Sequence, residues 1–301
     1  MSAYRKILVG VDGSSASTRG LREAVRLAKA QGAQLCILQV VNEFDAYAVM
    51  EGAGLGADLL ATLRDNGRRI LAKAQSVAES HAVKTSGVLR QVAGGPVADV
   101  IVREARKLGA DLIVLGTHGR RGLRRLVLGS DAEQVVRIAP VPVLLVRAKG
   151  ASLMGAYRKI LVAVDGSAAS NKGLAEALRL AKAERAGLCI LHVVNDYVVM
   201  ASMGGVAPPR DLGPLLRESG ERILARAKAL AAKQRLKPVV VLREVLSGPA
   251  AESIVREAKK QRADLIVLGT HGRRGVRRLV LGSDAEQVVR TASVPVLLVR
   301  A

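Results

Sequence analysis

The chain contains the same unit twice, and this repeat limits the folds open to it more than any other feature. Residues 111–137 recur as residues 264–290 with one difference, Leu123 against Val276. The tripeptide beginning at Asp12 also recurs, 153 positions later. An internal repeat of this kind marks a duplicated structural unit. We therefore expect two copies of one domain.

The length agrees with that division. At roughly 100–200 residues per domain, 301 residues have room for two domains. The repeat predicts a first domain at residues 1–148 and a second at residues 157–301. The intervening residues 149–156 contain glycine and serine, a composition typical of a short flexible linker.

Within each copy, short apolar runs alternate with amphipathic patterns. The expected strands of the first copy are Lys6–Val11, Leu35–Val41, Thr85–Val92, Leu112–Leu115 and Val143–Arg147. The expected helices are Ala16–Lys29, Ala57–Ala78, Pro96–Leu108 and Ser130–Ile138. Strands that are apolar on both faces and alternate with helices predict a parallel sheet covered on both sides. Each copy should be a five-stranded, doubly wound α/β domain.

The composition restricts the partners. Lys and Arg total 47 against 26 Asp and Glu, a net charge of +21 shared by both copies. Such an excess favours anionic partners, including nucleotides, nucleic acids and acidic membrane surfaces. With four Tyr, one Phe and no Trp, base-stacking platforms for single strands are hard to build. Nucleic acid is therefore disfavoured, although the charge leaves it open.

The expected compartment is the cytoplasm. The N-terminus lacks the apolar core of a signal peptide, and no apolar run approaches the roughly 18 residues of a membrane helix. Cys36 and Cys189 lie in apolar runs and are expected to be buried, reduced thiols.

The most informative motif follows the fourth expected strand, where parallel α/β sheets bind ligands. Its spacing is G-x2-G-x9-G-S, from Gly116 to Ser130, and it recurs in the second copy. Glycines let a backbone approach a ligand closely, although they also make tight turns. We expect Ser130 to be the N-cap of the next helix, with Glu133 completing a capping box. Such a helix start attracts anions.

These features resemble the universal stress protein family, in its nucleotide-binding branch and in a tandem form. The resemblance rests on the Asp-Gly-Ser that ends the first strand, the glycine motif and the terminal Val-Pro-Val strand, and covers nearly the whole chain. It implies a Rossmann-like sheet with strand order 3-2-1-4-5, bound ATP or AMP, and a role in stress response or regulation.

The resemblance also implies where the nucleotide lies. Adenine is expected at Val11, Asp12 and Val41, and at Val164, Asp165 and Val194. Phosphates and ribose are expected at Gly116, His118, Gly119, Gly129 and Ser130, and at Gly269, His271, Gly272, Gly282 and Ser283. His81 and His192 have no counterpart in the other copy and are interpreted as structural.

The acidic residues near these positions have two interpretations. Asp131 and Asp284 follow the Gly-Ser pair, where relatives that bind ATP usually have a small apolar residue. A carboxylate there stabilises a helix start and competes with phosphate, or it helps hold a bridging Mg²⁺ or Mn²⁺. Asp12 and Asp165 either shape a turn or meet a ribose hydroxyl or a metal.

The remaining motifs favour binding over catalysis. Four arginines in Arg120–Arg125, and their twins in Arg273–Arg278, could close over a triphosphate or form a solvated basic loop. No P-loop, nucleophile elbow or Cys/His set is present. The alternatives to a nucleotide-binding regulator are a nucleotide-free interaction protein and a slow ATPase. The apolar strands Val141–Val146 and Val294–Val299 should pair the two copies, and the chain could dimerise further.

Overall fold

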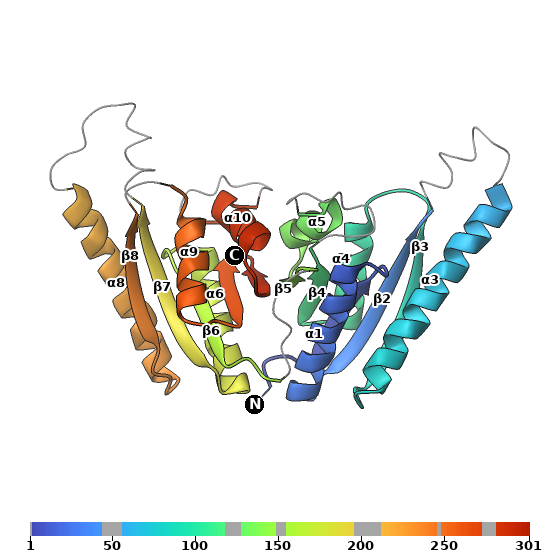
Figure 1. Cartoon of the computed structure of the whole chain (residues 1–301), viewed down its shortest axis with the longest axis horizontal. Helices are drawn as coiled ribbons and strands as arrows, with labels where there is room; N and C mark the ends of the chain where they lie inside the picture. Colours follow the sequence, from blue (N-terminus) through green and yellow to red (C-terminus); the bar gives the residue numbers. More distant parts are fainter. Residues whose placement is uncertain are drawn as a thin grey trace, which may run out of the picture. The chain divides into compact units, whose positions relative to one another are not determined.

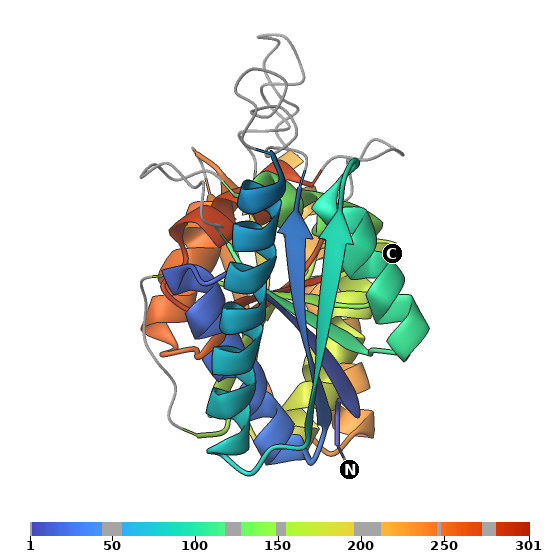
Figure 2. The same cartoon turned by 90° about the vertical axis from the view of Figure 1, so that its right-hand side faces the viewer.

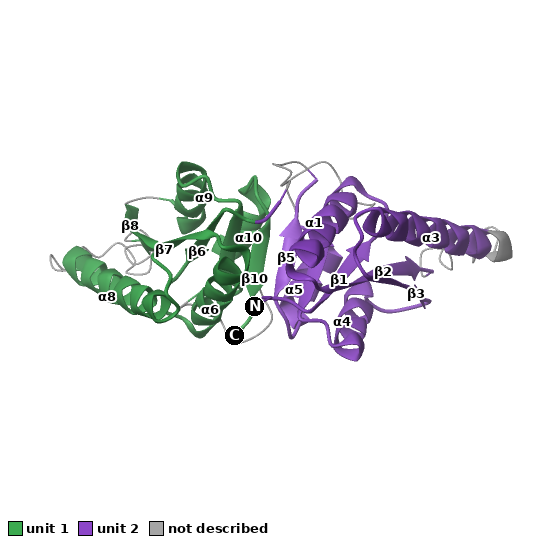
Figure 3. Cartoon of the chain, turned by 90° about the horizontal axis from the view of Figure 1, so that it is seen from below, with its two compact units in different colours: residues 1, 157–301 green, residues 2–156 purple. Residues whose placement is uncertain are grey.

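The computed structural model describes residues 2–43, 56–117, 128–148, 155–195, 212–245, 248–272 and 281–301. The chain falls into two units, residues 2–156 and residues 157–301 (Figure 3). Most of the expected linker, residues 149–154, lies outside the described residues.

Strands and helices alternate along each unit (Figure 1). The first unit contains β1 (Lys6–Val11), α1 (Ser15–Gln31), β2 (Gln34–Asn42), α3 (Gly56–Glu79), β3 (Thr85–Val92), α4 (Val97–Leu108), β4 (Leu112–Gly116), α5 (Ser130–Ile138) and β5 (Val143–Val146). The second contains β6 (Lys159–Ala163), α6 (Ala168–Glu184), β7 (Gly187–Asn195), α8 (Leu212–Lys233), β8 (Val239–Val245), α9 (Ala250–Lys260), β9 (Leu265–Gly269), α10 (Ser283–Thr291) and β10 (Val296–Val299). The elements expected in the first copy are therefore confirmed, with ends that shift by at most two residues.

Each unit has one parallel sheet with the same topology. The strand order is β3-β2-β1-β4-β5 in the first unit and β8-β7-β6-β9-β10 in the second. This confirms the order 3-2-1-4-5 in both copies. In the first unit, β2 and β3 lie on one side of β1, whereas β4 and β5 lie on the other. The topological switch point, where the direction of the connections changes, therefore lies at the carboxyl ends of β1, β2 and β4.

The helices cover both faces of each sheet. In the first unit, α1 packs with α3, while α4 packs with α5. Helix α3 runs alongside β2 and β3 (Figure 2). The central strands lie between these layers, and Ile7, Leu8 and Val9 of β1 are completely buried. Apolar burial on both strand faces explains the continuous apolar runs in the sequence.

A buried carboxylate joins one helix to the edge of each sheet. The Glu104 carboxylate on α4 accepts hydrogen bonds from Arg90 of β3 at 2.8 and 3.0 Å. The Arg90 guanidinium lowers the pKa of Glu104 below its usual value. In the second unit Glu257 pairs with Arg243 at 2.9 Å and accepts a bond from Gln261 at 2.8 Å. Burial opposes ionisation of Glu257, but these two partners outweigh it and lower its pKa.

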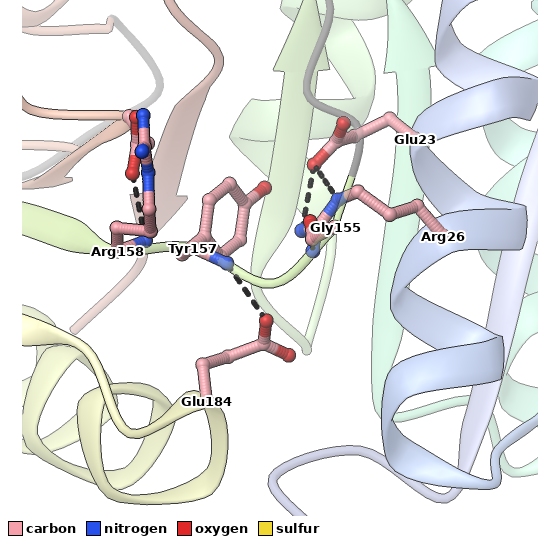
Figure 4. A network of polar contacts seen from close by, with 7 residues as sticks. Glu23, Arg26, Gly155, Tyr157, Arg158 and Glu184 are labelled. Atoms are coloured by element: carbon pink, nitrogen blue, oxygen red, sulfur yellow. Dashed lines mark hydrogen bonds and ion pairs between the residues drawn. The ribbon is translucent and has the colours of Figure 1, made fainter.

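Other polar contacts hold the end of the first unit and the start of the second, each within its own unit (Figure 4). In the first unit Arg26 donates to Glu23 at 2.9 Å and to the carbonyl oxygen of Gly155 at 2.7 Å. In the second unit Glu184 accepts a hydrogen bond from the backbone N–H of Tyr157 at 3.0 Å. Arg26 thus ties Gly155 to α1 of the first unit, and Glu184 ties Tyr157 to α6 of the second.

The cysteines are buried and unpaired thiols, as the sequence predicted. Burial raises the pKa of Cys36, and it raises the pKa of Cys189 to about 11. Over the parts of the chain that the structure describes, no helix is both long enough and apolar enough to cross a membrane.

Candidate functional site at the carboxyl ends of the central strands

The Asp-Gly-Ser tripeptides make the turn between the first strand and the first helix of each domain. Asp12 Oδ1 accepts a hydrogen bond from the backbone N–H of Ser14 at 2.8 Å. Ser14 is the N-cap of α1, and its Oγ accepts from the N–H of Ser17 at 3.1 Å. In the second domain Asp165 Oδ1 accepts from the N–H of Ser167 at 2.9 Å, and Ser167 caps α6. One carboxylate oxygen of each aspartate, Oδ1, therefore serves to form the turn.

The glycine motif meets this turn in the second domain. Ser167 Oγ donates a hydrogen bond to the carbonyl oxygen of His271 at 3.3 Å. A Cβ atom at Gly272 would lie only 2.8 Å from Asp165 Oδ2. The loop after β9 therefore lies against the turn after β6, and a side chain at Gly272 would displace the carboxylate. In the first domain His118 and Gly119 lie outside the described residues.

The helix that follows the motif starts beside the same loop. The N–H of Gly282 donates to the carbonyl oxygen of Thr270 at 2.9 Å, and Gly129 makes the same bond to Thr117 at 2.8 Å. A Cβ atom at Gly282 would lie 3.2 Å from the Thr270 carbonyl oxygen. Glycine at this position allows the start of α10 to approach the motif closely.

The expectation that Ser130 is an N-cap is wrong. Gly129 is the N-cap of α5 and makes no side-chain cap bond, so Ser130 is already the first helical residue. Gly282 and Ser283 have the same positions at α10. The hydrogen bond from Gly129 to Thr117 determines where the helix begins, which overrides the stronger capping tendency of serine. The first-turn amides consequently donate no hydrogen bond to an N-cap side chain.

Gly116 and Gly269 have a packing role that the sequence does not reveal. A Cβ atom at Gly116 would lie 2.7 Å from the carbonyl carbon of Ala16 and 2.7 Å from the nitrogen of Ser17. The corresponding distances at Gly269 are also 2.7 Å. The missing side chain thus lets the first turn of α1 touch the end of β4, and the first turn of α6 touch the end of β9. Close helix packing accounts for these two glycines.

Asp284 forms a hydrogen bond with a neighbouring helix. Its Oδ1 accepts a hydrogen bond from the backbone N–H of Ala251, in the first turn of α9, at 3.2 Å. Pro249, the N-cap of α9, makes no side-chain cap bond, so Asp284 supplies a cap from another helix. Asp131 is exposed in the first turn of α5. Among the described residues, no group of three or more His, Cys, Asp or Glu is placed to hold a metal ion.

Four of the six residues expected around adenine are buried at the ends of the first two strands, and the other two, Asp12 and Asp165, are partly exposed. The buried residues are Val11, Val41, Val164 and Val194. Nδ1 of the buried His192 lies 2.6 Å from the carbonyl oxygen of Val164, so Nδ1 carries the hydrogen of this bond. A Cβ atom at Gly220 on α8 would lie 2.7 Å from the His192 ring. His192 therefore has the structural role expected for it.

Sequence reasoning missed the counterpart of His192 in the first domain. Gln39 occupies that position and is buried, and its Oε1 has no hydrogen-bond partner among the residues that are described. Gly67 on α3 faces the same region, since a Cβ atom there would lie 2.6 Å from Val41 Cγ2. The available signal was the difference between Gln39 and His192 in otherwise similar strands. The arginine-rich runs Arg120–Arg125 and Arg273–Arg278 lie outside the described residues.

The glycine motif, the Asp-Gly-Ser turn and the tandem sheet topology occur together in both domains. The sequence model of the universal stress protein family matches residues 3–147 and again residues 156–300. The chain belongs to the universal stress protein family. As a tandem universal stress protein, it carries one complete family domain in each half.

Two of the similar proteins match along nearly the whole chain, and a third matches about half of it. The chain is 30% identical over 299 residues to a universal stress protein of Mycolicibacterium smegmatis, covering 98% of this chain and 96% of the relative. It is 30% identical over 313 residues to one of Mycobacterium tuberculosis, covering 100% and 99%. A universal stress protein of Methanocaldococcus jannaschii is 35% identical over 144 residues, 48% of this chain and 82% of that protein.

The fold also agrees with solved structures that match along nearly the whole chain. The crystal structure of a universal stress protein from Archaeoglobus fulgidus has a TM-score of 0.70 and 19% identity, and the match covers 99% of this chain and 97% of that one. A putative universal stress protein from Pseudomonas aeruginosa has a TM-score of 0.64 and 21% identity, with 99% and 94% covered. These likenesses establish the fold.

Proposed function

We propose that each domain binds an adenine nucleotide, ATP or AMP, at the carboxyl ends of its central strands. The observation that carries the proposal is the meeting of the loop at Gly272 with the turn at Asp165, beside the start of α10. The nucleotide would act as a regulatory ligand in a cytoplasmic stress response, through a change in conformation or association.

The described residues of the second domain suit such a ligand. The start of α10 has a glycine N-cap, so its first-turn amides can donate to phosphate oxygens without competition from a capping side chain. The positive end of the helix dipole favours the same anion. The Asp165 carboxylate lies against Gly272 of the same loop and can accept a hydrogen bond from a ribose hydroxyl.

The bond from Ala251 to Asp284 changes the role proposed for this carboxylate. Because Asp284 Oδ1 serves the first turn of α9, we propose that the residue holds α9 to α10 and contributes little to metal binding. Any Mg²⁺ or Mn²⁺ that accompanies a triphosphate would then rely on the phosphate oxygens and on the several waters that Mg²⁺ usually keeps.

Direct identification of the nucleotide tests the proposal. The purified full-length chain is denatured, and any released nucleotide is identified by its mass; calorimetry with ATP and AMP then gives the number of sites. Gly272→Val should remove one site, because its side chain would enter the space beside Asp165. Gly94→Val is the control, since a Cβ atom at Gly94 has no neighbour within 4 Å.

Several outcomes would decide against the proposal. Full nucleotide stoichiometry in a folded Gly119→Val, Gly272→Val double variant would refute the site. Absence of both released nucleotide and calorimetric binding would favour the nucleotide-free interaction protein, for which the capping role of Asp284 is the supporting observation. ATP turnover that disappears in the double variant would favour the slow ATPase.

Association through Val141–Val146 and Val294–Val299 stays a prediction. Light scattering of the full-length chain with and without ATP would measure its oligomeric state. Replacing Leu145 and Leu298 by arginine should abolish any dimer that these strands form, and a dimer that persists in the folded variant would contradict the prediction.

A further inference from the structure

The two domains differ at the ends of three equivalent helices, where the backbone is left-handed. The first domain has Gly32, Ala82 and Gly109 there, and the second has Arg185, Arg235 and Arg262. The φ angles of the three arginines are 55°, 62° and 52°. A left-handed backbone disfavours residues with a Cβ atom, and glycine is the usual choice after a helix. The second domain thus has arginine at three positions where, in the first domain, glycine or alanine is enough to form the same left-handed helix end.

Arg185 and Arg235 line the same cavity. It has a volume of about 480 Å³ and lies between the C-terminal ends of α6 and α8. Its other charged lining residues are Lys182 and Lys233, and Ala181, Ala186 and Leu236 provide apolar surface. Because β7 and β8 begin just after these helices, the cavity lies at the amino ends of the strands. It is therefore at the opposite edge of the sheet from the candidate nucleotide site.

The four cationic side chains have no anionic partner in the described part of the chain. All four are exposed, and none forms a salt bridge or a side-chain hydrogen bond with a described residue. The only carboxylate on the adjoining helix end, Glu184, is buried and accepts from the backbone N–H of Tyr157. No acidic residue lines the cavity.

The helix dipole explains only part of this cluster. A cation in the last turn of a helix is stabilised by the negative end of the dipole, which accounts for Lys182 and Lys233. It does not account for arginine at a left-handed position beyond the helix. In the first domain the positions equivalent to the four cations are Lys29, Gly32, Ser80 and Ala82, so the same helix ends need only one cation.

We propose that this cavity is an anion-binding site, particular to the second domain, for a compact ligand with several phosphate groups. Guanidinium groups bind phosphate through paired hydrogen bonds, and lysines add point charges. The cavity volume is within the usual range for small-molecule sites. Its lining contains no aromatic residue on which a base could stack, so the phosphates themselves are the recognised groups.

The concave shape favours a compact polyanion over an extended nucleic acid. A duplex presents its phosphates along a convex surface and would need cations spread over a wide area. Here four cations surround one cavity. The proposed site is separate from the nucleotide site, and the two proposals can fail independently.

Tripolyphosphate is the probe, and calorimetry on the full-length chain is the measurement. The test variant is Arg185→Gly combined with Arg235→Ala, which gives the second domain the residues of the first. Glycine suits the left-handed backbone at position 185, and the first domain already has alanine in this conformation at Ala82, so the variant should remain folded. The control is Arg262→Gly, which removes an arginine from another left-handed position outside the cavity lining.

We expect the double variant to bind tripolyphosphate at least about tenfold more weakly than wild type, because two charge-assisted contacts are lost. The control should bind as wild type does. Lys182→Ala with Lys233→Ala should show a similar loss without any change in left-handed backbone. Any binding of the probe at the candidate nucleotide sites is common to all variants and cancels in the comparison.

Three results would overturn the proposal. Equal affinity in wild type and the double variant would show that the cavity does not bind the probe. An equal loss in the Arg262→Gly control would show that total charge, and not the cavity, attracts the anion. Tight binding of a 20-base-pair DNA duplex that depends on Arg185 and Arg235, with no binding of tripolyphosphate, would identify a nucleic-acid surface instead.

Discussion

Gly269→Ala should destabilise the second domain even when no ligand is present. The added Cβ atom would lie 2.7 Å from the carbonyl carbon of Ala169 and 2.7 Å from the nitrogen of Ser170. Both are backbone atoms in the first turn of α6, so no side-chain rotation can relieve the overlap. Either the helix start or the end of β9 must move.

The size of the effect follows from the overlap. Non-bonded carbon atoms prefer separations of about 3.5–4.0 Å, so the new contact is too short by about 1 Å. Overpacking of this kind costs about 1–3 kcal/mol, and a rigid backbone neighbour places Gly269→Ala toward the upper end. For a domain of this size, about 2–3 kcal/mol lowers the melting temperature by about 6–10 °C.

Gly173→Ala is the matched control on the opposite side of the same contact. A Cβ atom at Gly173 would lie 3.4 Å from the nitrogen of Gly269, which requires only a small adjustment. Alanine also raises helix propensity by about 1 kcal/mol relative to glycine. The control should therefore stay within about 1 kcal/mol of wild type. Calorimetric unfolding without nucleotide measures both variants, and wild-type stability of Gly269→Ala would refute the packing role.

Three further expectations concern charges and thiols. Arg90 lowers the pKa of Glu104, so this carboxylate stabilises the fold above its unfolded pKa of about 4.5, and the stabilisation is lost as pH falls through the lower folded pKa. Glu104→Gln should lower the free energy of unfolding, measured in urea, by about 1–2 kcal/mol at pH 7 and by much less at pH 3. An equal decrease at both pH values would contradict this. Asp284→Ala should lose about 0.5–1 kcal/mol with the bond from Ala251, and Asp284→Asn should recover most of it, as urea midpoints would show. Cys189, with its pKa raised to about 11, should resist iodoacetamide at pH 8 until the protein is denatured; rapid labelling of the native protein, followed by mass spectrometry, would disagree.

The sequence predicted the fold well because its signals are local and occur twice. Apolar runs identified the strands, and the repeat required the same topology in both halves. The turn chemistry at Asp12 and Ser14 was also readable, since each contact spans only a few residues.

The features that the sequence did not reveal depend on contacts between distant segments. Gly129, not Ser130, is the N-cap of α5, because its N–H donates a hydrogen bond to the carbonyl oxygen of Thr117 at the end of β4. The reason for glycine at Gly116 is the approach of α1, about a hundred residues earlier in the chain. The partner of Asp284 belongs to a different helix. None of these contacts has a signature in neighbouring residues.

The hydrogen bond between Asp284 and Ala251 connects the candidate site mechanically to the exposed helix α9 of its domain. Helix α10 starts beside the glycine loop, and its second residue holds the first turn of α9. A shift at the start of α10 would therefore stretch or bend that bond and move α9 with it. The exposed face of α9 presents Glu252, Arg256 and Lys260. A partner that recognises this charged face could sense the occupancy of the site without touching the ligand.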